Sequence, residues 1–158
     1  MNALEALQYR TSSPRLMDPE PTSDQLDHLF RAAVRAADHG LLRPWRFLII
    51  RGQARSRLGD LLVAAARQEN PEISAAQADK LAAKPLRAPL IVVTIASPKQ
   101  HPKVPEFEQT LSAAAATQNM INAAFALDLG VMWRTGSPAY QSIVLRGLGL
   151  EENEKIVG

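Results

Sequence analysis

The chain has 158 residues, of which 46% are hydrophobic and 22% are charged, and its formal net charge at pH 7 is +2. This composition is typical of a globular protein with one core, and it argues against intrinsic disorder. Because the chain contains no cysteine, disulfides, thiolate metal ligands and cysteine nucleophiles are excluded, and redox chemistry would need a bound cofactor.

The N-terminal part of the chain predicts two helices. Residues 2–9 fit a short helix, and a second helix begins at Thr22, where Thr22 and Gln25 have the spacing of a capping box. Apolar residues then recur at helical spacing, and Gly40 is predicted to follow the last turn. The residues on this apolar face are Leu26, Leu29, Phe30, Ala33, Val34 and Ala37.

The middle of the chain predicts two strands separated by two helices. The apolar stretch RFLIIR at residues 46–51 is typical of a buried strand, and residues 90–96 form a second one. Helices are predicted over residues 53–67 and 74–83. The longest apolar run, residues 89–96, has the length of a strand, and a bilayer span would need about 20 residues.

The last third of the chain centres on a long helix. A loop at residues 97–105 precedes this helix, which is predicted over residues 106–129. Its middle is small or apolar on nearly every face, which indicates burial or an oligomer interface. A third strand and turn are predicted at 131–136, a further helix at 139–148, and the start of a fourth strand at 155–158.

No repeat, low-complexity tract or linker divides the sequence. We therefore expect one α+β domain over residues 1–158, with helices packed around a small central sheet. The N-terminus carries Glu5 and lacks the basic region and cleavage site of a signal peptide, so we expect a cytoplasmic protein.

Three polar stretches each place an arginine beside hydroxyl or amide donors where an element ends. Arginine and hydroxyl donors together suit a phosphate group. Each stretch also has an ordinary interpretation: Arg10 can complement a helix C-terminus, Arg134 can be an exposed charge on an edge strand, and His39 can be a polar helix end. The stretches are YRTSS at 9–13, RAADHG at 35–40 and WRTG at 133–136.

Two other kinds of site are not supported by the sequence. His28, His39 and His101 lie far apart, with no carboxylate at ligand spacing, so no metal site is predicted. Glu106 and Glu108 point apart on a helix and therefore form no acid/base pair; we expect them to favour the helix N-terminus.

Five motifs follow one another in a fixed order over nearly the whole chain. They are Arg10 and Ser12 after the first helix, RAADHG at 35–40, the group Pro44, Trp45 and Phe47, KVPEFEQ at 103–109, and GVMWRTG at 130–136. In this order and spacing they resemble the FMN-dependent nitroreductase family. The Asp38–His39 pair makes the chain most similar to its branch of small, YdjA-like NAD(P)H nitroreductases.

The resemblance implies a nitroreductase-like α+β fold with helices around a small central mixed sheet. It implies that Arg10 and Arg134 bind the phosphate of FMN, and that Arg35 and His39 reach the flavin of the partner subunit. No catalytic side chain is implied, because the flavin carries the chemistry, although His39 is a candidate proton donor. The positions implied to bind the cofactor are Arg10, Thr11, Ser12, Arg35, His39, Pro44, Trp45, Trp133, Arg134 and Thr135.

The sequence departs from the common family pattern at three places. Ala37-Asp38 stands where Pro-Ser is common, Arg43 stands where a glutamine precedes Pro-Trp, and Thr11 replaces a residue that is often basic. Family members continue beyond KIVG, so we expect a C-terminal strand and extension to be missing after Gly158.

The resemblance implies an FMN-dependent oxidoreductase. Electrons would pass from NADH or NADPH to nitroaromatic, quinone or similar electron-poor acceptors by a ping-pong mechanism, in a homodimer with the flavin at the subunit interface. Neither a membrane nor nucleic acid is expected as a partner. The alternative is a non-catalytic flavin-binding module or a basic nucleic-acid-associated module. A nucleic-acid role is disfavoured because Lys and Arg are dispersed and only 5% of residues are aromatic.

Overall fold

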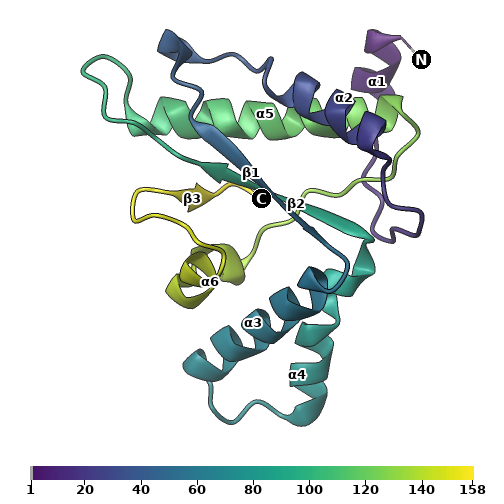
Figure 1. Cartoon of the computed structure of the whole chain (residues 1–158), viewed down its shortest axis with the longest axis vertical. Helices are drawn as coiled ribbons and strands as arrows, with labels where there is room; N and C mark the ends of the chain where they lie inside the picture. The colour runs from purple at the N-terminus through teal and green to yellow at the C-terminus, as the bar shows by residue number, and fades with distance from the viewer. Residues whose placement is uncertain (1) are drawn as a thin grey trace.

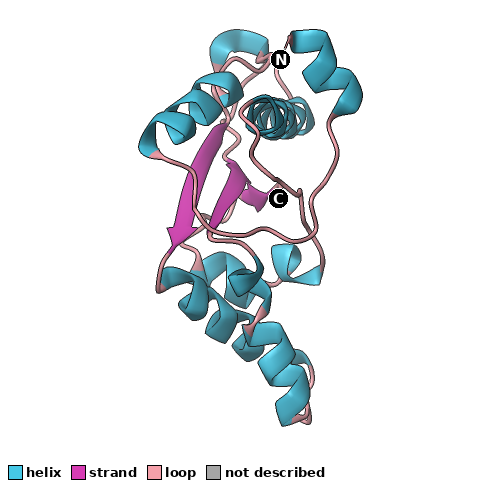
Figure 2. Cartoon of the chain, turned by 90° about the vertical axis from the view of Figure 1, so that its right-hand side faces the viewer, coloured by secondary structure: helices cyan, strands magenta, loops and turns pink. Residues whose placement is uncertain are grey.

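Helix α5 (Glu106–Ala126) lies at the centre of the computed structural model, which describes residues 2–158. Small side chains let other elements approach this helix closely, and Ala113, Ala116 and Ala124 are almost fully buried. Figure 1 shows α5 crossing above the sheet, and Figure 2 looks along its axis. The expected long helix is therefore confirmed, although it ends at Ala126 and not at residue 129.

The other elements surround α5 and a small sheet. In chain order they are α1 (Ala3–Tyr9), α2 (Ser23–Ala33), η1 (His39–Leu41), β1 (Trp45–Arg51), α3 (Ala54–Glu69), α4 (Ala75–Ala82), η2 (Lys84–Arg87), β2 (Leu90–Ala96), α5, η3 (Ser137–Tyr140), α6 (Ser142–Gly147) and β3 (Lys155–Ile156). The predicted capping box is present, since the side chains and backbone N–H groups of Thr22 and Gln25 bond reciprocally. Within residues 2–158, no helix is both long and apolar enough to cross a membrane.

The sheet has the order β1-β2-β3, and both strand pairs are antiparallel. The pairing of β1 with β2 runs from Trp45 opposite Ala96 to Arg51 opposite Leu90. The expectation of a mixed sheet is thus wrong for residues 2–158. The reason is the α3–α4 hairpin, which carries the chain out and back, so that β2 starts where β1 ends and runs the opposite way (Figure 1).

Side chains alternate across β1 and β2, so both faces of the sheet are covered. Trp45 and Phe47 face the cluster built by α2 and α5, whereas Ile50, Val93 and Ile95 form a second cluster against α3 and the end of α6. The buried members of the first cluster are Leu26, Leu29, Ala33, Ala116, Met120 and Ala124. This arrangement confirms the expected α+β architecture.

Two sequence expectations about the ends of elements are wrong. Helix α2 ends at Ala33, seven residues before Gly40, and by Asp38 the backbone is extended and leads the chain towards β1. Val34 and Ala37, expected on the apolar face, are exposed. Gly40 does have a positive φ of 78°, but within the short turn η1.

Residues 131–136 do not form the predicted strand. The position beside β2 is taken by the C-terminal residues instead, with Ile156 opposite Ile95 and a hydrogen bond from Val157 N–H to the Thr94 carbonyl. Residues 155–156 are therefore the third strand and not the fourth.

A partly buried ion pair joins β1 to the loop before β3. Arg46 donates from Nε to Glu154 Oε1 at 2.7 Å and from Nη2 to Oε2 at 2.6 Å, and Nη2 also reaches the Gly149 carbonyl. The backbone N–H of Glu151 donates to Glu154 as well. These hydrogen bonds, Arg46 first, outweigh burial and lower the pKa of Glu154 to about 2. The pair also raises the pKa of Arg46.

We predict that this pair makes folding stability sensitive to acid. Because the folded-state pKa of Glu154 lies near 2, below the ordinary 4.5, its contribution is fully present above pH 4.5 and is lost as the pH falls towards 2. Glu154→Gln should lower the free energy of unfolding at pH 7 by roughly 2–3 kcal/mol. The loss should shrink progressively between pH 4.5 and pH 2 in urea titrations. Glu152→Gln, an exposed change in the same loop, is the control; equal stability of both variants at pH 7 would contradict the assignment.

Candidate functional site

The polar stretch at 9–13 contacts the segment that leads from α5 to the stretch at 133–136. The backbone N–H of Ser13 donates to the Val131 carbonyl at 3.0 Å. A Cβ atom at Gly130 would lie 2.8 Å from Leu16 Cδ2 and 3.4 Å from Ser13 Cβ. A larger residue at position 130 would require the Leu16 side chain to move. The segment after α1 and the segment after α5 therefore form one junction, which we call the α1–α5 junction (residues 10–13 and 130–135).

The α1–α5 junction carries uncompensated donors. Arg10 follows α1 and is half-buried, while Thr11, Ser12, Arg134 and Thr135 are exposed. Within residues 2–158, neither arginine takes part in an ion pair. Guanidinium groups and hydroxyls are the donor types that suit a dianionic phosphate.

Trp133 fixes the C-terminal side of the junction. Its indole Nε1–H donates to the Val157 carbonyl at 3.1 Å, and it packs so closely on Gly158 that any Cβ there would clash. The next two residues, Arg134 and Thr135, line a recess of about 170 Å³ between α3, β2 and α6. The packing of Trp133 therefore fixes the backbone from which the Arg134 side chain extends.

The third polar stretch runs from beside the middle of α5 to its N-terminal end. His39 Nδ1 and Glu108 Oε2 are 2.8 Å apart, which leaves Nε2 of the half-exposed imidazole free. Arg35 is exposed. It lies one turn after Ala32, whose carbonyl accepts a hydrogen bond from Asn119 Nδ2 in the middle of α5. Sequence analysis placed Glu108 only as a first-turn acid, because its partner lies 69 positions away and no spacing relates the two.

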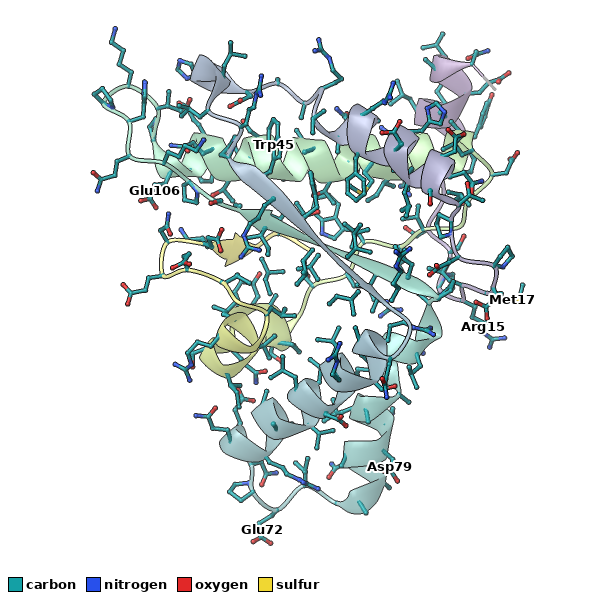
Figure 3. All side chains as sticks on the ribbon, viewed as in Figure 1. Arg15, Met17, Trp45, Glu72, Asp79 and Glu106 are labelled. Atoms are coloured by element: carbon teal, nitrogen blue, oxygen red, sulfur yellow. The ribbon has the colours of Figure 1, made fainter. Side chains whose placement is uncertain are left out.

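One subunit does not bring the two halves of the expected site together. His39 contacts the first turn of α5, whereas Arg10 and the α1–α5 junction lie beyond its last turn. A helix of 21 residues is about 30 Å long. Figure 3 shows the separation, with Glu106 on one side of the molecule and Arg15 and Met17 on the other.

Pro44 and Trp45 support the loop before β1. Pro44 is fully buried, and its carbonyl accepts from the Ser97 backbone N–H. Trp45 is half-buried, packs against the α2–α5 cluster, and pairs with Ala96 of β2. In this subunit both side chains anchor the segment that carries His39.

The segment from Asp38 to Arg43 has an enforced backbone. Leu41 and Arg43 have positive φ angles of 54° and 49°, which are unfavourable for residues with a Cβ. Asp38 Oδ2 accepts from the Arg43 backbone N–H at 2.6 Å, and Lys99 Nζ donates to the Leu42 carbonyl at 2.7 Å. These contacts hold the strained turn in place, and they could not be predicted from sequence because Lys99 is remote.

Known proteins match the chain over nearly its full length. Residues 7–158 match the model of a family described as the nitroreductase family. The chain is 40% identical over 162 residues to "Putative NAD(P)H nitroreductase YdjA" of Escherichia coli K12, covering 100% of this chain and 85% of that protein.

Solved structures agree in fold. A nitroreductase-like family protein from Bacillus cereus has a TM-score of 0.87 at 23% identity, covering 100% of this chain and 82% of that one. A "putative nitroreductase in complex with FMN" from Desulfovibrio desulfuricans has a TM-score of 0.70 at 25% identity, covering 98% of this chain and 80% of that one.

Proposed function

The chain belongs to the nitroreductase family and is an enzyme of that class, and we propose that it is an FMN-dependent oxidoreductase. In this proposal NADH or NADPH supplies electrons, and nitroaromatic, quinone or similar electron-poor compounds accept them. The observation that carries the proposal is the uncompensated donor set at the α1–α5 junction. The FMN complex of the Desulfovibrio relative supports the choice of ligand.

The α1–α5 junction would hold the phosphate of FMN. Arg10 and Arg134 offer guanidinium donors, and Ser12 and Thr135 offer hydroxyls, with Thr11 beside them. When bound, FMN supplies the chemistry of accepting a hydride from the nicotinamide and passing electrons to the acceptor. The protein itself contributes binding, orientation and electrostatics.

A second subunit would complete the site. His39 lies at the first turn of α5, too far from the α1–α5 junction of the same chain to reach a ligand held there, so it would contact the flavin held by the partner, and we propose that Arg35 does so as well. An exposed apolar stripe on α5 supports this assembly. Phe107 and Leu111 lie one turn apart and are 71% and 52% exposed, and a two-fold contact between helices would bury them.

The chain's own groups would handle protons and solvent. The Glu108 carboxylate holds His39 Nδ1, so that Nε2 is directed outwards as a donor or acceptor. The other titratable groups of the proposed site are arginines, which stay charged and donate hydrogen bonds without releasing protons. We therefore propose that protons come from solvent, with His39 as the one side chain suited to relay them.

We predict that the phosphate dominates FMN retention. Arg10→Ala and Arg134→Ala should each weaken FMN binding by about 1.5–3 kcal/mol, the usual contribution of a charged hydrogen bond. Riboflavin, which lacks the phosphate, should bind weakly to all variants. Fluorescence titration measures both ligands, and Arg57→Ala on α3 serves as a control. Unchanged FMN affinity in both site variants would refute the phosphate assignment.

We predict a homodimer that depends on the exposed stripe of α5. Light scattering should give the wild-type protein twice the 17.3 kDa mass of one chain. Leu111→Glu should shift the mass towards the monomer, because two carboxylates would be buried at the contact. Leu86→Glu is the matched control, since Leu86 in η2 is 50% exposed, close to the 52% of Leu111. A flavin-loaded wild-type monomer at micromolar concentration would rule out the proposed assembly.

We predict ping-pong kinetics. With no cysteine in the chain and one proposed redox group, donor and acceptor would use the same place in turn, and the oxidised nicotinamide would leave before the acceptor enters. Initial rates measured against NADH or NADPH at several fixed nitroaromatic concentrations should give parallel double-reciprocal lines. Intersecting lines would indicate a ternary complex and would count against a shared place.

A further inference from the structure

The strained segment Asp38–Arg43 presents two side chains outwards. Leu41 is 80% exposed, and Arg43 is also exposed. Within residues 2–158, Arg43 takes part in no ion pair. Backbone strain persists where the surroundings enforce it, and it concentrates at functional sites. Here Asp38 and Lys99 enforce a turn that exposes an apolar group and a cation two residues apart.

The loop that contacts this segment lines an open cavity of about 580 Å³. Lys99 lines the cavity and also donates to the Leu42 carbonyl, and Val104, another lining residue, lies 3.6 Å from where a Cβ at Gly40 would be. The volume falls in the range of sites for small organic molecules, about 300–1,000 Å³. The cavity is therefore large enough for a substituted aromatic ring.

The walls of the cavity are held in shape by a buried amide. Gln109 is 1% exposed, accepts from the Lys99 backbone N–H, and donates to the carbonyls of Lys99 and Val104. Asn153 adds a hydrogen bond to the Pro98 carbonyl. A loop fixed in this way offers a preformed surface, which reduces the entropy lost on binding.

Two lysines and one carboxylate lie on or beside the walls of the cavity. Lys99 and His101 line it, and His101 Nδ1 accepts from the Lys103 backbone N–H at 3.2 Å, so the neutral ring carries its proton on Nε2 as a donor. The carboxylate among the lining residues, Glu106, lies 3.8 Å from Lys155, which offsets its charge. An anionic ligand is thus favoured over a cationic one.

We propose that Leu41, Arg43 and this cavity form the acceptor subsite, and that the subsite selects electron-poor aromatic acceptors that carry a carboxylate. This inference rests on the proposed function, because it places the segment of His39 beside the flavin of the partner. Leu41 contacts the ring, and Arg43 binds the carboxylate, for which its planar fork of donors is suited. Lys99 adds positive potential from the cavity wall, and His101 offers an N–H donor.

The kinetic experiment compares 4-nitrobenzoate with its neutral analogue 4-nitrobenzamide. For each variant, the ratio of the two kcat/KM values is compared with the wild-type ratio. This comparison cancels the difference in reactivity between the two rings. Arg43→Gln keeps the backbone N–H bonded to Asp38 but removes the charge, and it should lower the ratio about fivefold, the upper range for an exposed charge contact. Arg43→Lys should keep the ratio within about twofold of wild type, as should Lys84→Gln, a control in η2. A ratio unchanged in Arg43→Gln overturns the proposal.

A binding experiment separates this inference from the proposed function. Calorimetry with the FMN-supplemented protein should show that benzoate binds more weakly to Arg43→Gln than to wild type, while benzamide binds equally to both; Leu41→Ala should weaken both ligands. If this pattern holds but no donor is oxidised, the proposed function fails and the anion subsite stands. If nitro compounds are reduced but benzoate binding does not depend on Arg43, the subsite is wrong and the function stands.

Discussion

The packing of α5 is the constraint on which the rest of the structure depends. Its alanine-rich surface lets α2 and the sheet approach so closely that Ala113 and Ala116 have no exposed surface. A buried helix of this length also fixes what lies at its two ends. His39 is tied to the first turn through Glu108, and Gly130 brings the segment after the last turn against residues 13–16. The distance between the halves of the proposed flavin site is therefore a property of the core.

Much of the fold could be predicted from sequence because the signals were local. The capping box at Thr22 and Gln25 and the apolar runs of β1 and β2 depend on neighbours in the chain, and they occur as expected. The errors arose where segments far apart in the sequence compete for the same position in the fold. Residues 131–136 have strand-like composition, but the chain end takes the edge of β2, and alanines extend the pattern of α2 where the chain must turn towards β1. Such outcomes depend on residues that lie far apart in sequence.

The candidate site, like the fold, could be predicted from the sequence only in part. Residue types were enough to single out Arg10, Arg134 and His39, since arginine and hydroxyl clusters have an obvious anionic ligand. The sequence did not reveal the groups that position these residues. Glu108, Gln109 and Lys99 act through side-chain hydrogen bonds to other segments, and the positive φ of Arg43 leaves no trace in its side-chain chemistry. Sequence patterns identify donors, whereas tertiary structure decides where the donors point.

The ion pair of Arg46 with Glu154 connects the two segments that carry the halves of the proposed flavin site. Arg46 directly follows Pro44-Trp45, where the strained segment ends, and Glu154 directly precedes β3, beyond which Val157 accepts from Trp133. Each subunit would thus offer two halves of the proposed flavin site, which its own fold keeps apart. Under the proposed function, flavin would bind only where half-sites of two subunits meet. Linkage then requires that flavin binding and subunit association strengthen each other by the same factor, because a ligand held across an interface favours the assembled state.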